Sequence, residues 1–514
     1  MERVSKSRIK NTKRNIVSGL IKQIISILLP FIIRTIIIYT LGTAYSGLNG
    51  LFSSILQVLN LTDLGFTAAV TFVMYRPIAD GDNESVSAIL NFLKKTYFIV
   101  GIVILLIGLA ITPLLSYLIS GEIPSDINIY LLFLIYLFNT VISYLLFAYK
   151  GALFNAMQRE DVVSNIYSVT SFFIKGIQIL LLIFLRNYYV FIMVMPLGTV
   201  ANNILLQVFS KKYFPEIIPN GKLPKETYRV IIKQVKALFV GKLGTVARNS
   251  LDDVMISFFM GLVAVAIYDN YYYIFSAIYG ILLVLTQSMQ ASVGNSIAKE
   301  TKLKNYKDLL KFNFLFMWIV GWCSITMSCL YQPFMFLWMR GDTNMLLSLL
   351  DMFLLCLYFY ILNMNNARNL FLEGNGLYHE CRLWFVLEAV GNLVLNLLLG
   401  YFLGITGIIL ATIITIFVFN FITRTNVVFK HYFNISPKEF YLKHLLYFLI
   451  TICVGFVTYH LCDFIRIEGF LNIIIRSLLC VVLPNVLFLA FLFKTKEFKE
   501  AKGLVLGLLH NKKN

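Results

Sequence analysis

Long apolar runs follow one another along the whole chain, and short charged or Gly/Pro-containing breaks separate them. Each run holds about 20 residues or more, which is enough for a helix to cross a hydrocarbon core of about 30 Å. The pattern therefore predicts an all-α integral membrane protein with about 14 transmembrane helices. Their expected ranges are 15–41, 47–74, 88–118, 128–149, 162–185, 188–210, 230–260, 262–293, 312–333, 345–372, 382–402, 405–428, 441–462 and 470–493.

The composition agrees with this reading. The 514 residues are 59% hydrophobic and 14% charged, whereas soluble domains are about 25% charged. The segments between the runs are short, so no soluble domain is expected. The basic N-terminal segment precedes an apolar run that is too long for a signal-peptide core, and we expect this run to be a retained first span.

Lys and Arg gather in alternate turns. They crowd the N-terminal segment, the turn around Lys94, the stretch around Lys222 and the C-terminal tail, whereas "LGTAYSG", "SGEIPSDIN" and "LGITG" hold none. The positive-inside rule then predicts that both termini are cytoplasmic. The net charge of +18 is mostly a topology signal, and no basic soluble face for nucleic acid is expected. The basic tail is expected either along the anionic inner leaflet or free in solvent.

Two halves of the chain resemble each other. "LGTAYSGLNGLFSSIL" from Leu41 is similar to "MGLVAVAIYDNYYYIF" from Met260, and "GALFNAMQRED" is similar to "RNLFLEGNGLYHE". Six helices per repeat keep the orientation, so we expect two six-helix lobes related by a pseudo-twofold axis along the membrane normal, plus two C-terminal helices. The expected domains are an N-terminal lobe at 1–212, a cytoplasmic inter-lobe loop at 213–229, a C-terminal lobe at 230–430, the last two spans at 431–494 and the basic tail at 495–514.

Several motifs resemble one known family. The central arginine of "FIIRTIIIYTLG", the stretch "YSGLNGLFSSILQVLNLTDLGFTAAVTFVMYRPIADGD" and "LFNAMQRED" are similar to the bacterial polysaccharide (oligosaccharide) flippases of the MOP superfamily, which also holds lipid II flippases and MATE exporters. The resemblance implies translocation of undecaprenyl-diphosphate-linked oligosaccharide across the cytoplasmic (inner) membrane for capsule, exopolysaccharide or O-antigen synthesis. It further implies alternating access with a cationic central cavity, with membrane lipids, the polysaccharide polymerase machinery and H+ or Na+ as partners.

Charged residues inside the spans are the candidate site. A charge that faced lipid at the midplane would cost on the order of 2.5 to 3.5 kcal/mol, so these groups are expected to face protein or water. An arginine can hold a diphosphate through two parallel hydrogen bonds. The candidate headgroup-binding cations are Arg34, Lys175, Lys242, Arg248 and Arg368, and the candidate ion-coupling or charge-partner acids are Asp63, Asp252 and Asp253.

Each candidate has a second interpretation. Arg248 and Asp252 are four positions apart on one helix face, so they form either a structural ion pair or a phosphate-binding arginine with its holding carboxylate. Arg34 has no acidic residue three or four positions away, which favours either a cross-helix pair with Asp63 or a ligand. Lys175 is explained equally by snorkelling to the edge of the cavity.

Asparagines cluster in "LNMNNARNL". Asn363, Asn365 and Asn366 are candidate contacts for sugar hydroxyls, and hydrogen bonds between helices are the alternative interpretation.

Other function classes fit the sequence less well. A MATE-like cation-coupled multidrug exporter would favour an acidic cavity, a lipid II flippase would share the cationic one, and a glycosyltransferase would need a larger outer loop. The chain has no Walker-A loop, seven cysteines without a C-x-x-C pair and five scattered histidines. We therefore expect a transporter rather than an enzyme, with no cofactor and no metal site.

Overall fold

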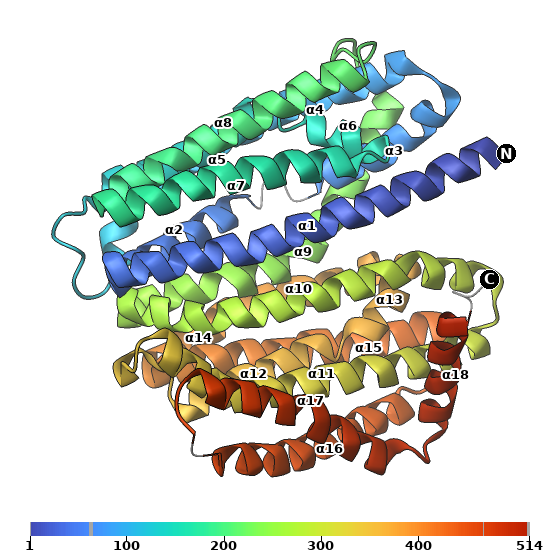
Figure 1. The fold of residues 1–514 in the computed structure, drawn as a ribbon. Coiled ribbons are helices and arrows are strands. Elements are labelled where there is room, and N and C mark those ends of the chain that lie inside the picture. Colours follow the sequence, from blue (N-terminus) through green and yellow to red (C-terminus); the bar gives the residue numbers. More distant parts are fainter. Residues whose placement is uncertain (1, 61–64, 466, 511–514) are drawn as a thin grey trace. The chain divides into compact units, whose positions relative to one another are not determined.

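The computed structural model describes the backbone of residues 2–60, 65–465 and 467–510. It describes side chains over the same ranges except at residues 2–13, 16, 237–238, 240–249, 291 and 504–510. These residues are helical nearly throughout and contain no strand. Contacts divide the chain into two compact units, Met1–Ala266 and Ile267–Asn514, each of which is a bundle of helices (Figure 1).

The first unit holds nine helices and the start of a tenth among its described residues. They are α1 (Glu2–Thr40), α2 (Thr43–Leu59), α3 (Phe66–Asp80), α4 (Asn83–Ile111) with the 3-10 turn η2 (Thr112–Tyr117), α5 (Ile129–Leu145), α6 (Lys150–Ala156), α7 (Glu160–Leu185), α8 (Tyr188–Tyr213), α9 (Lys225–Met260) and the first residues of α10 (Leu262–Lys299).

The second unit continues from α10. Its elements are α11 (Lys302–Trp338), the 3-10 turn η3 (Thr343–Met345), α12 (Leu349–Asn363), α13 (Asn366–Gly374), α14 (Tyr378–Thr415), the π-helical turn η4 (Ile416–Ile422), α15 (Thr423–Val428), the π-helical turn η5 (Phe429–Phe433), α16 (Lys438–Asp463), α17 (Phe470–Leu492) and α18 (Lys496–His510).

Ten helices of the described residues are long and apolar enough to cross a membrane, or up to eleven when a bent pair is counted as one span. The multi-pass character of the chain is therefore confirmed, whereas the count of 14 is not. Expected spans are interrupted in both units. Range 47–74 is divided between α2 and α3, and range 345–372 is divided between α12 and α13. In range 128–149, α5 ends at Leu145, and α6 follows from Lys150 at an angle of 53°.

One continuous helical segment, Tyr378–Phe433, contains two expected spans. Its backbone leaves helical geometry at Gly404, where φ is 60°, and the residues on either side of this point contact each other. Asn392 donates to Thr412 Oγ1 at 3.0 Å, and a Cβ at Gly407 would lie 2.0 Å from the carbonyl oxygen of Leu399. The segment therefore folds back at Gly404 into two antiparallel arms, as the ranges 382–402 and 405–428 predict.

Within the first unit, turns expected on the same side of the membrane meet one another. At one end of the first unit, Arg14 pairs with Asp161 at 2.8 Å and Asn83 donates to Glu216 at 2.8 Å. At its other end, the Ser120 amide donates to the Ser257 carbonyl at 3.0 Å. The grouping agrees with the expected alternation, and which end faces the cytoplasm stays a prediction.

The internal repeat is visible in the helix breaks. In both halves the fourth expected span is broken before a short helix, α6 in the first and α13 in the second, and both short helices bury a Leu-Phe pair at the matched positions. Residues with positive φ also recur 218 to 220 positions apart. The pairs are Gly42 and Gly261, Gly121 and Gly341, Gln158 and Gly376, and Arg186 and Gly404.

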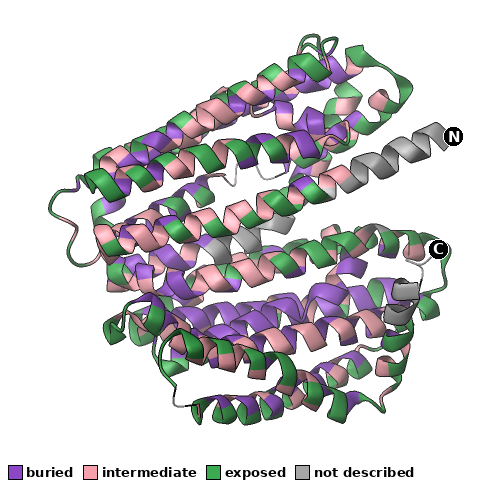
Figure 2. Cartoon of the chain, viewed as in Figure 1, coloured by how far each residue is buried: buried purple, intermediate pink, exposed green. Residues whose placement is uncertain are grey.

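Burial separates central from peripheral helices in the second unit. In the most apolar 18-residue stretch of each helix, 56% of the residues of α11 are buried, compared with 17% of those of α17. Figure 2 shows buried residues in purple and exposed residues in green. Since the exposed side chains of α16 and α17 are mostly large and apolar, these two helices present a surface suited to lipid.

Candidate functional site

The acidic pair of α9 lies in the interior of the first unit. Asp252 is 3% exposed and Asp253 is 7% exposed, and the Ser54 hydroxyl on α2 donates to Asp253 Oδ2 at 2.5 Å. The chain permits this close approach because Gly47 has no side chain: a Cβ there would lie 2.0 Å from the carbonyl oxygen of Leu262. Asp253 therefore joins α9 to α2 in the described conformation.

Three sequence candidates fall outside the described part of the chain. They are Asp63 and the side chains of Lys242 and Arg248. The choice between a structural Arg248–Asp252 pair and a ligand-binding Arg248 therefore stays open.

Arg34 and Lys175 lie on neighbouring helices of the first unit. Arg34 is on α1 and Lys175 is on α7, two helices that pack along each other. Both residues are half-buried, so each keeps part of its surface accessible while its stem packs against protein. Two cations from the candidate set are thus presented by one helix pair.

The three asparagines lie at the break between α12 and α13. Asn363 donates to the Phe359 carbonyl at 2.8 Å, Asn365 donates to the Ile361 carbonyl at 2.9 Å, and Asn366 donates to Asn363 Oδ1 at 3.2 Å. The last four carbonyls of a helix have no intrahelical backbone partner, and the Asn365 amide donates to two of them in α12, those of Ile361 and Leu362. All three asparagines are buried, which favours a role in stabilising the helix break over contact with sugar.

Arg368 is fully buried in the second unit. Its Nη2 donates to the Asn420 side-chain oxygen at 2.7 Å and to the Asn420 carbonyl at 3.3 Å, and it also donates to Asn365. With no exposed surface, this guanidinium cannot touch a cargo in the described conformation. It instead ties α13 to η4.

The same unit contains a buried ion pair that the sequence analysis did not identify. Arg424, inside the expected span 405–428, lies in α15, is 6% exposed and pairs with Glu388 of α14. Its guanidinium carbon also lies 3.8 Å from the centroid of the Phe385 ring. The sequence contained a signal for this contact: Glu388 precedes the "LGITG" turn and Arg424 follows it, and antiparallel arms joined by a turn bring such positions together.

The "QRED" motif connects α1 and α7 at one end of the first unit. Asn15 of α1 donates to the Gln158 carbonyl at 3.2 Å and accepts from the Asp161 amide at 2.9 Å, while Asp161 pairs with Arg14 and Arg159. The motif therefore fastens the start of α1 to the start of α7.

These helices, with charged groups inside the spans, define a multi-pass membrane protein, and its fold is similar to that of several solved transporters. An inward-facing multidrug resistance MATE family transporter matches with a TM-score of 0.62 and 14% identity over 79% of this chain and 96% of that chain. Lipid II flippase MurJ in an inward closed conformation matches at 0.64 and 13% identity over 93% and 98%. A MOP superfamily transporter from Pyrococcus furiosus, described by the reverse polarity of its binding pocket, matches at 0.53 and 12% identity over 83% and 97%. At such identities the likeness shows the fold alone.

The sequence itself gives the family. The family model described as "Polysaccharide biosynthesis protein" matches residues 12–289, more than half of the chain, and the chain belongs to this family. No curated protein sequence matches it. The resemblance seen in the motifs is thereby confirmed.

Proposed function

We propose that this protein is a flippase that moves undecaprenyl-diphosphate-linked oligosaccharide across the bacterial cytoplasmic membrane by alternating access. The observation that carries the proposal is the match to a polysaccharide biosynthesis family on a chain whose fold is that of lipid II flippase MurJ and the MATE transporters. The expected products are capsule, exopolysaccharide or O-antigen. Membrane lipids and the polysaccharide polymerase machinery are the proposed partners.

The headgroup chemistry supports a role for the half-buried cations. A diphosphate that leaves water loses a hydration free energy much larger than the free energy of one hydrogen bond. Fixed positive charges on the protein must therefore replace the lost water. Arg34 and Lys175 keep accessible surface on α1 and α7, and Arg248 and Lys242 of α9 are proposed to act with them. Arg34 is the proposed bidentate contact because a planar guanidinium matches two phosphate oxygens.

The buried polar groups of the second unit are proposed to stabilise it rather than to bind cargo. Arg368 donates through Nη2, and the three asparagines donate through their side-chain amides, to groups of the same unit, whereas Nε and Nη1 of Arg368 have no partner among the described residues. In this proposal they hold the break between α12 and α13 in place.

The acidic residues are proposed to serve coupling. Asp63, Asp252 or Asp253 would exchange H+ or Na+ as the conformation changes, since a carboxylate that is alternately hydrated and enclosed binds and releases cations. The hydrogen bond from Ser54 to Asp253 supports this choice, because any movement of α9 against α2 alters the environment of that carboxylate.

The test is reconstitution in liposomes with three cargoes: undecaprenyl-diphosphate oligosaccharide, lipid II and an organic cation. We expect the oligosaccharide lipid to change leaflet, and we expect an imposed proton or sodium gradient to change its rate. Transport of lipid II alone would replace the proposed cargo with the peptidoglycan precursor. Efflux of the organic cation alone would establish a MATE-like exporter instead.

A further inference from the structure

Three cysteines of the second unit meet at one point. Cys329 comes from α11, Cys462 from the last turn of α16 and Cys480 from α17. Their sulfur atoms all lie within 4.8 Å of one another, and those of Cys462 and Cys480 are 3.9 Å apart. All three side chains are buried.

The spacing suits a metal ion. A metal–thiolate bond of about 2.3 Å places three sulfurs in a plane about 4 Å from one another. Soft thiolate ligands favour soft metal ions. Among these, Cu(I) binds sulfur ligands well and needs only a small coordination number. Buried thiols alone also occur as small hydrophobic groups, so the convergence from three helices needs a second observation.

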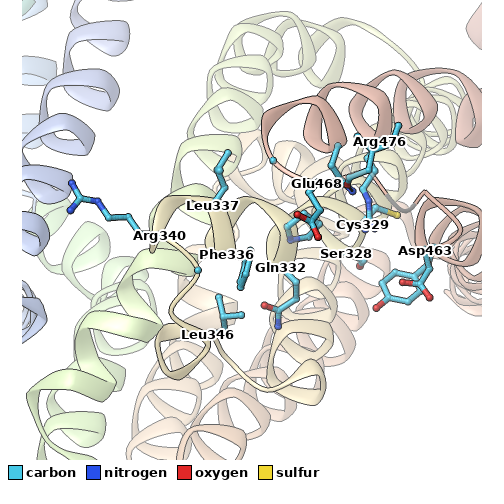
Figure 3. A pocket seen from close by; sticks show the side chains of 16 residues that line it. Ser328, Cys329, Gln332, Phe336, Leu337, Arg340, Leu346, Asp463, Glu468 and Arg476 are labelled. Carbon is cyan, nitrogen blue, oxygen red and sulfur yellow. Dashed lines mark hydrogen bonds between the residues drawn. The ribbon is translucent and has the colours of Figure 1, made fainter.

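That observation is the pocket beside the cluster, with a volume of about 700 Å³. Cys329 itself lines the pocket together with Asp463, Glu468 and Arg476 (Figure 3), so one thiol of the cluster borders a pocket with charged groups. The pocket belongs to the end of the second unit that is expected to face away from the cytoplasm.

Arg476 supplies the matching charge. It lies four residues before Cys480 on α17, on the same helix face, and it lines the same pocket as Cys329. Its buried Nε has no hydrogen-bond partner among the described residues. Three thiolates with Cu(I) carry a net charge of −2, which a neighbouring guanidinium would compensate.

We propose that Cys329, Cys462 and Cys480 form a three-thiolate site for one Cu(I) ion at the outer end of the second unit. Binding forms three Cu–S bonds without change of oxidation state, and the three displaced thiol protons pass to water, with the carboxylates of Asp463 and Glu468 in the adjoining pocket as intermediate acceptors. The ion would tie α16 and α17 to the central helix α11. This site does not depend on the cargo proposed above.

The test uses the full-length protein, purified in detergent with its thiols kept reduced and titrated with Cu(I) against a chromogenic Cu(I) chelator. We expect one equivalent to bind, with three sulfur scatterers in the X-ray absorption spectrum. Cys329→Ser, Cys462→Ser and Cys480→Ser should each weaken binding by at least about 100-fold, and Arg476→Gln should weaken it by about 10-fold. Arg476→Gln leaves every thiol in place, so it separates loss of charge from loss of fold.

Matched controls come from the same helices. Cys453→Ser on α16 and Cys323→Ser on α11 remove thiols outside the cluster and should leave binding unchanged. The proposal is overturned if the wild-type protein does not compete for Cu(I), or if the triple serine variant competes equally well. It is also overturned if protein isolated without reductant holds a Cys462–Cys480 disulfide, seen as a mass loss of two hydrogens.

Discussion

The Ser54 hydroxyl donates to the Asp253 carboxylate across 199 residues of sequence, at 2.5 Å and in a buried position. This contact ties α2 to α9 inside the first unit. A buried carboxylate that loses a hydrogen-bond donor loses part of the compensation for its desolvation cost.

Ser54→Ala is therefore expected to lower the free energy of unfolding in detergent by about 1 to 3 kcal/mol. Thermal unfolding of the purified protein measures the effect. Ser53→Ala is the matched control because Ser53 is the exposed neighbour on the same helix. Equal stability of the two variants would show that the contact contributes nothing measurable.

Arg34→Ala should abolish transport of the lipid-linked oligosaccharide in liposomes while the protein stays in the membrane. Arg34→Lys should restore it only in part, since an ammonium group is a point charge without the bidentate fork. Arg76→Ala, at an exposed position near the end of α3, is the control and should transport normally. Full activity of Arg34→Ala would remove this residue from the headgroup path.

Arg248→Ala distinguishes a phosphate contact from a structural pair. If Arg248 binds the headgroup, the single variant is abundant but inactive, and adding Asp252→Ala does not restore transport. If Arg248 and Asp252 instead form a structural pair, the single variant should have low abundance, because it leaves the buried Asp252 without its charge partner. The double variant should then recover both abundance and transport. Membrane abundance and liposome transport are measured together, and recovery of both would refute the headgroup role.

The Glu388–Arg424 pair of the second unit should be costly to break. Removing one partner of a buried ion pair destabilises a protein by roughly 3 to 5 kcal/mol, whereas replacing both with apolar residues is often neutral. Arg424→Met is expected to reduce membrane abundance strongly, and Glu388→Leu in the same chain should recover it. Arg382→Ala, at an exposed position, is the control. Normal abundance of Arg424→Met would contradict the prediction.

Cysteine labelling tests the sidedness. In a background without native cysteines, Glu122→Cys in "SGEIPSDIN" should react with an impermeant reagent from outside intact cells, and Lys222→Cys should react only after the membrane is opened. Both positions are exposed. Labelling of Lys222→Cys in intact cells would invert the topology.

The apolar pattern predicted most of the helices because membrane spans are set by length and hydropathy, which a single sequence displays. It failed to show where spans break, since nothing in the hydropathy of range 128–149 marks the bend before Lys150. The charges were found, but their roles were not predictable, because Arg368 is enclosed by Asn420, 52 positions away. The three-cysteine cluster was missed altogether, since its members lie 18 or more residues apart along the chain.

The fold-back at Gly404 has a consequence for biogenesis. Glu388 lies on one arm and Arg424 on the other, so an arm that entered the membrane alone would carry an unpaired charge, which is unfavourable in lipid. Entering side by side, the arms neutralise these charges before either meets lipid. The insertion machinery is therefore expected to release residues 378–433 as one hairpin, and the second unit can complete its packing only after the whole hairpin has been synthesised.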